Sequence, residues 1–217
     1  MTRPAGCVPE RGGGGSRPAS IHPIEVESYR ILGERADLSA FGPLAAAVVA
    51  RVIHASADID YASTMVVDEA SVEAGVAALE AGGPVVVDVE MVRHGISGAE
   101  ALCYLPDPGT PTGPELTRSA AGMRIAAARH PEGAVVVVGC APTALAEVIR
   151  LHDQGEWAPA LVVGLPVGFV GAAEAKDALR TSSLPAISNV GEKGGSAVAA
   201  AALNALLRLT TGGSVRG

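Results

Sequence analysis

Three short apolar runs, rich in valine, limit the fold more than any other feature of this sequence. They lie at residues 85–89, 134–138 and 161–163, and a weaker fourth run lies at 186–190. Each has glycine or proline close to one or both ends. Nearly continuous apolar runs of this length are typical of strands that are covered on both faces. They therefore predict a parallel sheet, because helical crossovers then cover both faces.

Helical patterns alternate with these runs. They cover residues 117–129, 142–152, 172–179 and 196–207, and residues 102–105 are predicted as an edge strand. Strands that alternate with helices predict an α/β fold with a doubly wound sheet. At 217 residues the chain fits one such domain. We expect a single domain with a mostly parallel, twisted sheet of about five strands flanked by helices.

The first third of the chain is less regular. Pro23 can occupy the first turn of a helix that continues to Ile31. Ser39 is the predicted N-cap of a long helix that carries His54, and Ser71 is the predicted cap of a helix that ends at glycines 82 and 83. The segment 61–67 between them is open to two interpretations, a short strand or an irregular crossover.

The two ends of the chain differ in composition from the rest. Residues 1–20 contain four consecutive glycines and are predicted to be a disordered leader, and residues 210–217 are predicted to be a flexible tail around a domain at 21–209. The leader has no apolar core, so it is not a secretory signal. No apolar run is long enough to span a membrane. Three cysteines without a CxxC pair indicate neither disulfides nor a zinc site, and we expect a cytoplasmic location.

Composition also excludes some partners. The net charge is −7 and aromatic residues make up 3% of the chain, so neither a basic patch for phosphates nor a stacking surface for bases is expected. Gly164, Gly168 and Gly171 do not have the GxGxxG spacing of a dinucleotide site, and the GxxxxGK[ST] order of a P-loop is missing. No HExxH or paired-carboxylate pattern suggests a metal or hydrolysis.

A ligand is expected at the carboxyl ends of the strands, where doubly wound sheets bind theirs. The segments that follow the strands are 90–95, 139–143, 164–168 and 191–196. Several are rich in glycine and proline and lead into a helix. Free main-chain N–H groups and the positive end of a helix bind anions. The sequence thus predicts a pocket for a negatively charged ligand.

Histidine is the side chain best suited to proton transfer near neutral pH, and two histidines are candidates. His54 lies on an alanine-lined stripe of its helix with Arg51 and Asp58 as neighbours, whereas His94 follows a strand. A structural role for His54 remains an alternative at this point. Arg118, at the start of a helix, and Lys193 each have two interpretations, a ligand for a carboxylate or a solvated side chain.

Several short motifs of the sequence resemble those of the precorrin-8X methylmutase family, in order, from about Ile24 to Leu207. The matching motifs are Val-Ile-His-Ala-Ser at 52–56, Asp-Val-Glu-Met-Val-Arg-His-Gly at 88–95, Thr-Arg-Ser-Ala-Ala at 117–121, Ala-Pro-Thr-Ala-Leu at 141–145, Leu-Pro-Val-Gly-Phe-Val-Gly-Ala-Ala-Glu at 165–174 and Gly-Gly-Ser-Ala at 194–197. Ala175 departs from the serine expected in the family, and the glycine-rich leader is unusual.

The resemblance implies an isomerase of cobalamin biosynthesis. It would move a methyl group from C11 to C12 of precorrin-8X to give hydrogenobyrinate, or do the same on the cobalt form. The family is expected to need no cofactor or metal and to work as a homodimer with the corrinoid near the interface. His54 matches its catalytic histidine, which would protonate or hydrogen-bond the ring beside the migrating methyl. Candidate substrate-binding residues are Ser28, Ser97, Arg118, Ser119, Thr143, Lys193, Gly194 and Gly195.

Two other hypotheses stand beside catalysis of the methyl shift. The first is a corrinoid-binding or carrier protein without relevant turnover. The second is a nucleotide-dependent α/β enzyme, which the missing glycine fingerprints disfavour. A spectral change on mixing with substrate separates the first from an enzyme, and stabilisation by NAD or ATP would support the second.

Overall fold

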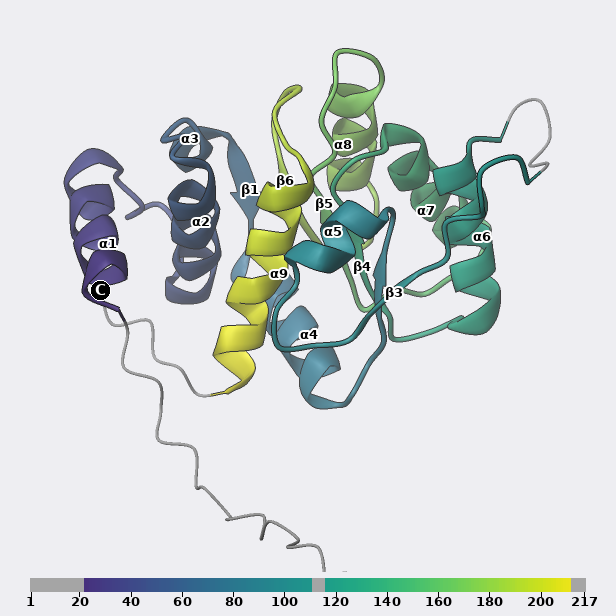
Figure 1. The fold of residues 1–217 in the computed structure, drawn as a ribbon, viewed down its shortest axis with the longest axis horizontal. Coiled ribbons are helices and arrows are strands. Elements are labelled where there is room, and N and C mark those ends of the chain that lie inside the picture. Colours follow the sequence, from purple (N-terminus) through teal and green to yellow (C-terminus); the bar gives the residue numbers. More distant parts are fainter. Residues whose placement is uncertain (1–21, 111–115, 212–217) are drawn as a thin grey trace, which may run out of the picture.

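The computed structural model describes residues 22–110 and 116–211, and Figure 1 shows its arrangement. The predicted leader and most of the predicted tail lie outside these residues. The strands are β1 (Met65–Val67), β2 (Val85–Val87), β3 (Ala101–Cys103), β4 (Val135–Val138), β5 (Leu161–Gly164) and β6 (Ala186–Asn189). The helices are α1 (Pro23–Arg35), α2 (Pro43–Ser56), α3 (Tyr61–Thr64), α4 (Glu69–Glu80), α5 (Glu90–Gly95), α6 (Arg118–Arg129), α7 (Pro142–Asp153), α8 (Ala172–Thr181) and α9 (Ser196–Thr210).

The strands form one mixed sheet in the order β1-β6-β5-β4-β2-β3. β2 to β6 run parallel to one another, and β1 pairs antiparallel with β6, with Met65 opposite Asn189. The α/β class, the mostly parallel sheet and the edge position of β3 are confirmed. The sheet has six strands rather than about five, because the ambiguous segment 61–67 forms one helical turn and then the edge strand β1.

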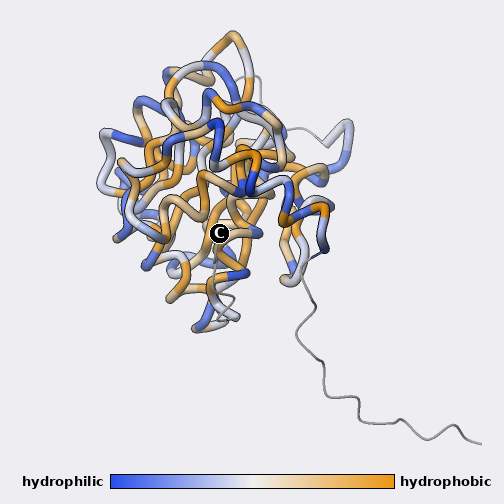
Figure 2. Tube along the Cα trace, turned by 90° about the vertical axis from the view of Figure 1, so that its left-hand side faces the viewer, coloured by the Kyte–Doolittle hydropathy of each residue, from blue (hydrophilic) through white to orange (hydrophobic). Residues whose placement is uncertain are grey.

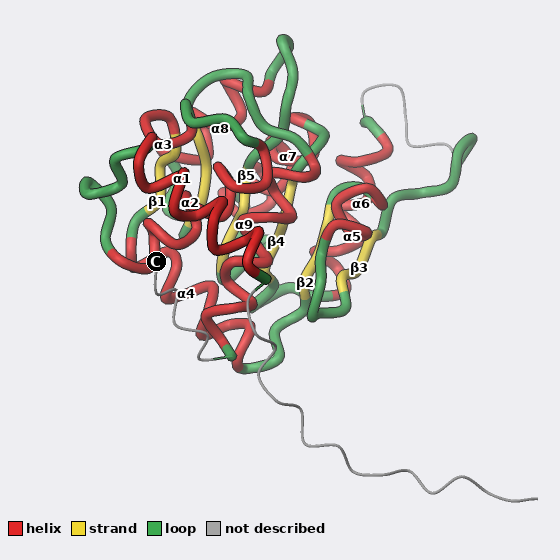
Figure 3. Tube along the Cα trace, turned by 60° about the vertical axis from the view of Figure 1, so that its left-hand side comes forward, coloured by secondary structure: helices red, strands yellow, loops and turns green. Residues whose placement is uncertain are grey.

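Helices cover both faces of the sheet and create two hydrophobic cores, as the valine runs predict (Figure 3). Val135 and Val137 face α2, α4, α5 and α9, whereas Val136 and Val138 face α6, α7 and α8. All four of these valines are fully buried. Figure 2 shows hydrophobic segments toward the middle and hydrophilic ones at the periphery. α1 lies outermost and packs on α2 rather than on the sheet (Figure 1).

Two predicted N-caps are wrong, because Gly42 and Asp68 hold these positions, and in both helices a carboxylate accepts hydrogen bonds from the first turn. The helix with His54 starts at Pro43, where Glu69 accepts hydrogen bonds from the main-chain N–H groups of Leu44 (3.2 Å) and Ala45 (2.8 Å). A Cβ on Gly42 would lie 2.3 Å from Glu69, so the cap glycine makes room for that carboxylate. α4 is capped by Asp68, not by Ser71.

The remaining helices agree with the sequence within a few residues, with one omission. Residues 90–95, expected as a loop after β2, form the short helix α5. Pro23 does begin α1, and Gly82 has a positive φ of 77° after α4. Among the described residues, no helix is long and apolar enough to cross a membrane.

Candidate functional site

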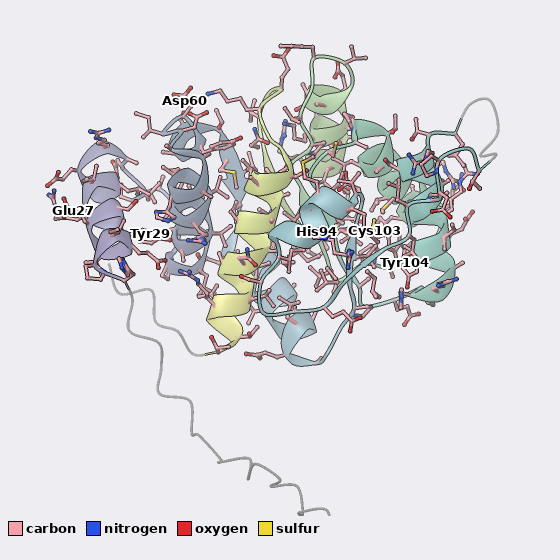
Figure 4. All side chains as sticks on the ribbon, in the orientation of Figure 1. Glu27, Tyr29, Asp60, His94, Cys103 and Tyr104 are labelled. Atoms are coloured by element: carbon pink, nitrogen blue, oxygen red, sulfur yellow. The ribbon has the colours of Figure 1, made fainter. Side chains whose placement is uncertain are left out.

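His54 lies in the last turn of α2, and its imidazole faces α1. Ser28 Oγ is 2.8 Å from His54 Nδ1, and the Tyr29 ring stacks on the imidazole with centroids 4.9 Å apart and planes 9° apart. Figure 4 shows Tyr29 between α1 and α2. A hydrogen bond and a stacked ring together fix both the tilt and the rotation of the imidazole. The histidine is thus half-buried and oriented by two consecutive residues of a neighbouring helix.

Three charged groups surround this histidine. The Glu25 carboxylate lies 2.8 Å from the Arg208 guanidinium and 3.6 Å from that of Arg51. Two cations and one carboxylate leave this cluster with an excess positive charge when His54 is neutral. Burial, followed by the positive field of Arg51, lowers the pKa of His54 below its usual 6.5, while Glu25 acts in the opposite direction. The free protein therefore holds His54 mainly neutral at pH 7.

Arg51 has hydrogen-bonding capacity that the chain does not use. Its Nε is buried and has no hydrogen-bond partner among the residues that the structure describes, and its pairing with Glu25 at 3.6 Å is loose. A buried donor without an acceptor is costly. Arg51 precedes His54 by three residues on α2, so the two side chains are neighbours on the surface of the helix.

Asp58 and Lys193 pair with each other rather than with His54 or an open pocket. α2 ends at Ser56, and Ala57 adopts the left-handed conformation (φ 53°), so Asp58 leaves the stripe on which the sequence places it. Lys193 Nζ lies 2.7 Å from carboxylate oxygens of both Asp58 and Asp60, and these bonds raise the pKa of its ammonium. About half of its side chain remains exposed.

Gly194 and Gly195 allow two loops at the carboxyl edge to come into contact. A Cβ on Gly194 would lie 2.4 Å from the main-chain oxygen of Leu165, and Gly195 has φ 131°. The Gly195 N–H donates to the same Leu165 oxygen at 2.9 Å. Close main-chain packing thus requires Gly194, and the positive φ favours glycine at 195, whatever these residues bind.

A second group of candidates lies where α6 and α7 begin. The Thr117 and Thr143 hydroxyls are 2.8 Å apart, and Thr117 caps α6 by accepting from the Ala120 N–H. The Arg118 side chain is half-buried and donates twice to the carbonyl of Pro106, so it is not simply solvated. Ser119 follows in the same helical turn.

One expected anion site is already filled by the protein itself. The Asp88 carboxylate, 1% exposed, accepts hydrogen bonds from the N–H groups of Gly139 (3.1 Å), Cys140 (2.8 Å) and Ala141 (2.8 Å) at the start of α7. Burial raises the pKa of Asp88, and the three N–H groups oppose that shift. The expectation that segment 139–143 offers its N–H groups to a ligand is therefore wrong for residues 139–141, because an internal carboxylate takes these three groups.

Ser97 lies near α9, and His94 lies on α5. The Ser97 N–H donates to the Asn204 side-chain oxygen at 2.9 Å, and the Asn204 amide donates to the Gly95 carbonyl. His94 is 72% exposed, and its Nδ1 lies 2.7 Å from the Glu90 carbonyl of its own helix. Unlike His54, it has no stacked ring that orients it within the described residues.

The candidates divide into separate groups. Along the longest axis of the molecule, α1 and α2 stand at one end and α6 at the other (Figure 1). This agrees with the sheet order, in which β1 is at one edge and β2 and β3 are at the other. Ser28 and His54 meet, and Arg118, Ser119 and Thr143 share a second place, but one chain does not bring the two groups together. Two surface hollows, along residues 33–39 and between α6 and α7, are lined by neither group.

Three residues of the His54 environment were missed from the sequence, namely Tyr29, Glu25 and Arg208. Tyr29 adjoins Ser28, and Glu25 lies one turn before it on α1, so an α1–α2 contact would have predicted both. Nothing local marks Arg208, which comes from α9. Within residues 22–110 and 116–211, no group of three or more histidine, cysteine or acidic side chains could hold a metal ion.

Comparison with known proteins gives a consistent assignment. The sequence profile of the family described as Precorrin-8X methylmutase matches residues 23–209. Cobalt-precorrin-8 methylmutase of Methanothermobacter thermautotrophicus is 42% identical over 177 residues, covering 80% of this chain and 85% of that protein. Precorrin-8X methylmutase of Sinorhizobium sp is 42% identical over 196 residues, covering 85% and 93%.

The fold agrees with these sequence matches. The crystal structure of precorrin-8x methyl mutase from Thermus thermophilus superimposes with a TM-score of 0.81 at 39% identity, covering 89% of this chain and 98% of that one. A profile match over most of the chain and relatives above 40% identity leave one conclusion. The chain belongs to the precorrin-8X methylmutase family, the isomerases that move a methyl group on the corrinoid ring in cobalamin biosynthesis.

Proposed function

We propose that this protein converts precorrin-8X, or its cobalt form, to the C12-methylated corrinoid, with His54 as the hydrogen-bond donor or acid. Relatives named for both forms of the substrate support testing both. The observation that carries the role of His54 is its orientation by Ser28 and Tyr29. A histidine that only fills space in the core does not need its ring held in one orientation by both a hydrogen bond and a stacked ring.

The contact with Ser28 also suggests which nitrogen acts. When the Ser28 hydroxyl donates to Nδ1, the proton of a neutral imidazole resides on Nε2, which is the atom left for a ligand. In that tautomer neutral His54 can donate to the ring system next to the migrating methyl. Withdrawal of electron density there favours the shift from C11 to C12. Because the pKa of His54 is lowered, this donor is present at neutral pH without prior protonation.

Arg51 is the proposed partner for an acidic side chain of the corrinoid. Its side chain is about one-fifth exposed and only loosely paired with Glu25, it adjoins His54, and with Arg208 it gives the cluster an excess positive charge. A guanidinium binds a carboxylate through two parallel hydrogen bonds. A carboxylate bound at Arg51 would also offset the charge that lowers the pKa of His54. Substrate binding would thus raise the pKa of His54, so that the imidazole holds a proton more readily.

The group around Arg118 is proposed to act across a homodimer. If it contacts the same macrocycle as His54, the two groups must come from different copies, since they lie at opposite ends of one chain (Figure 1). In a two-fold dimer each site would take α1 and α2 from one subunit and the start of α6 from the other. The remaining binding candidates, Ser97, Ser119, Thr143, Lys193, Gly194 and Gly195, stay proposals for contacts around that ring.

The experiment is an absorbance assay of the purified protein with precorrin-8X and, separately, with the cobalt form. The account predicts conversion with many turnovers per protein chain and without added cofactor. With a carrier, the absorbance change would stop once one corrinoid is bound per site, and no product would accumulate beyond that amount. We place this activity in a domain spanning 21–209 and in the cytoplasm, which the unpaired cysteines 103 and 140 support.

A further inference from the structure

Lys176 is a fully buried lysine that the proposed chemistry does not use. It lies on α8, its exposed fraction is 0%, and it is one of only two lysines in the sequence. The other is Lys193, in the loop beside it. Lysine is almost never fully buried unless its ammonium is paired. The contacts of this ammonium therefore indicate its role.

The ammonium is bound to the segment that joins β6 to α9. Lys176 Nζ donates to the Asn189 side-chain oxygen (3.0 Å) and to the main-chain oxygen of Lys193 (2.6 Å). The Asn189 amide donates to the same Lys193 oxygen at 3.0 Å. Arg180, one turn along α8, donates to the Asn189 main-chain oxygen at 2.7 Å. Lys176 thus connects α8 to both ends of the turn at 189–193.

This turn is also paired with the loop after β5. The Gly168 N–H donates to the Glu192 oxygen (3.2 Å), and the Gly195 N–H donates to the Leu165 oxygen (2.9 Å). We call residues 164–171 and 189–195 the paired loops. They lie at the carboxyl ends of β5 and β6, where a ligand of this fold is expected. They also carry the proposed contacts at 193–195.

Stability alone does not explain a charge at this position. Both acceptors of the ammonium are neutral oxygens, and burial of a charge without a carboxylate partner is unfavourable. Well-packed apolar groups often replace buried charges at no loss of stability. Burial, and then the Arg180 charge, lower the pKa of Lys176 to about 8, while Glu192 acts in the opposite direction. We therefore attribute the ammonium to the conformation of the main chain to which it is hydrogen-bonded.

The geometry points to Lys176 as a positioning residue: its ammonium holds the paired loops in the shape in which the main-chain N–H groups of residues 193 and 194 receive an acidic side chain of the corrinoid. This inference rests on the proposed function, because it assigns that ligand to these loops. It predicts that the charged form of Lys176 binds ligand more tightly than the neutral form. By linkage, ligand then raises the pKa of Lys176, and affinity weakens as the pH rises through about 8.

The first experiment compares Lys176→Met with Glu174→Gln, an exposed charge change on the same helix. Methionine keeps the unbranched side chain as far as Cε and removes the ammonium with its donors. In Lys176→Met we expect the affinity for the corrinoid to fall, so that KM rises about tenfold. The value of kcat should change little. Glu174→Gln should keep both values. An unchanged KM in folded Lys176→Met, or a loss confined to kcat, would overturn the inference.

The second experiment remains decisive if Lys176→Met does not fold. Wild-type protein grown with 13C-lysine gives signals from only two lysine side chains, which Lys193→Gln assigns. Titration from pH 6 to 11 should show Lys176 losing its proton near pH 8 in the free protein and at higher pH with hydrogenobyrinate bound. The Kd of hydrogenobyrinate should rise across the same range. An identical titration with and without ligand would refute the inference.

Different results would contradict the proposed function and the proposed role of Lys176. If wild-type protein turns over neither form of precorrin-8X, the proposed function is wrong. If the wild type turns over substrate but Lys176 does not respond to ligand and its replacement leaves KM unchanged, only the role of Lys176 is wrong.

Discussion

Ser28 Oγ lies 2.8 Å from His54 Nδ1 and joins α1 to α2 at the candidate acid. α1 packs on α2 and contributes Leu32 to the core on that face of the sheet, and the Ser28 contact and the Tyr29 stack fix the part of α1 that lies against the imidazole. The arrangement leaves Nε2 for a ligand. α2, which carries the acid, stands near one end of the molecule (Figure 1), and the turn that follows it is tied to Lys193 in the loop after β6.

Ser28→Ala tests whether this contact orients the imidazole. Loss of one side-chain hydrogen bond of about 1 kcal/mol predicts a roughly fivefold fall in kcat, with the thermal midpoint nearly unchanged because the hydroxyl is near the surface. Steady-state assays and thermal melts measure both quantities. Unaltered kcat in Ser28→Ala would mean that Tyr29 and the helix backbone orient His54 on their own.

Arg51→Met tests the electrostatic control of His54. Removal of the guanidinium takes away a positive charge that lowers the pKa of His54, so that pKa should rise toward 6.5. NMR titration of the histidine ring protons measures it. Arg30→Met, on exposed α1 surface and paired with Glu27, is the matched control and should leave the titration where it is. An Arg51→Met titration identical to wild type would contradict the assigned cause.

The same substitution tests the carboxylate contact. With Arg51 replaced, KM for the corrinoid should rise more than about tenfold, because a charge-assisted bidentate pair is lost from a partly buried position. Arg30→Met should keep the wild-type KM. A normal KM in Arg51→Met would place the acidic side chains of the corrinoid elsewhere.

The strands and most helices could be predicted because their signals are local. Valine runs such as 135–138 are apolar at every position, and Pro23 or Thr117 mark helix starts directly. Features that depend on distant partners could not. Asp88 reaches across to the start of α7, and Glu69 caps α2 from another helix. The short α5 has only two turns, too few for its spacing to be distinguished from a loop.

The candidate site shows the same division. His54 and Arg51 share one helix, so their proximity follows from helical spacing. Arg208 reaches Glu25 from α9, a contact that no local pattern contains. Lys193 was open to two readings, and the structure adds a third, an ion pair with the turn after α2. Ion pairs of this kind form between loops whose positions depend on the whole sheet.

Mixed dimers test whether two subunits share each site. His54→Ala and Arg118→Ala should each be nearly inactive alone. After random exchange of subunits, half of the dimers are mixed and carry one intact site, so about a quarter of wild-type activity should return. Mixing His54→Ala with Arg51→Met is the control and should give no more activity than the Arg51→Met subunits have on their own, since both lesions lie in the same half-site. No recovery in the first mixture would refute the shared site.

Glu147→Gln tests stability away from the site. Glu147 is buried on α7 and bonds Arg124 and Arg150. Burial alone would raise its pKa, but the hydrogen bonds from Arg150 and Arg124 outweigh burial and lower it. The ionised form therefore stabilises the fold above pH 4.5, and that contribution is lost as the pH falls through the folded-state value.

We expect Glu147→Gln to lower the free energy of unfolding by about 1–2 kcal/mol at pH 7. The difference from wild type should shrink toward zero at the acid end of the range. Denaturant unfolding at pH 7 and pH 3.5 measures it, with Glu174→Gln as the exposed control. A deficit that stays constant between the two pH values would point to packing rather than charge.

The role of His54 is tested most directly by single-turnover conversion of precorrin-8X by His54→Ala, followed by absorbance. Removal of a general acid predicts a fall in the rate of the methyl shift of about 10²–10⁴-fold, while the thermal midpoint and the binding of hydrogenobyrinate persist. Conversion by folded His54→Ala at the wild-type rate would show that His54 is not the acid.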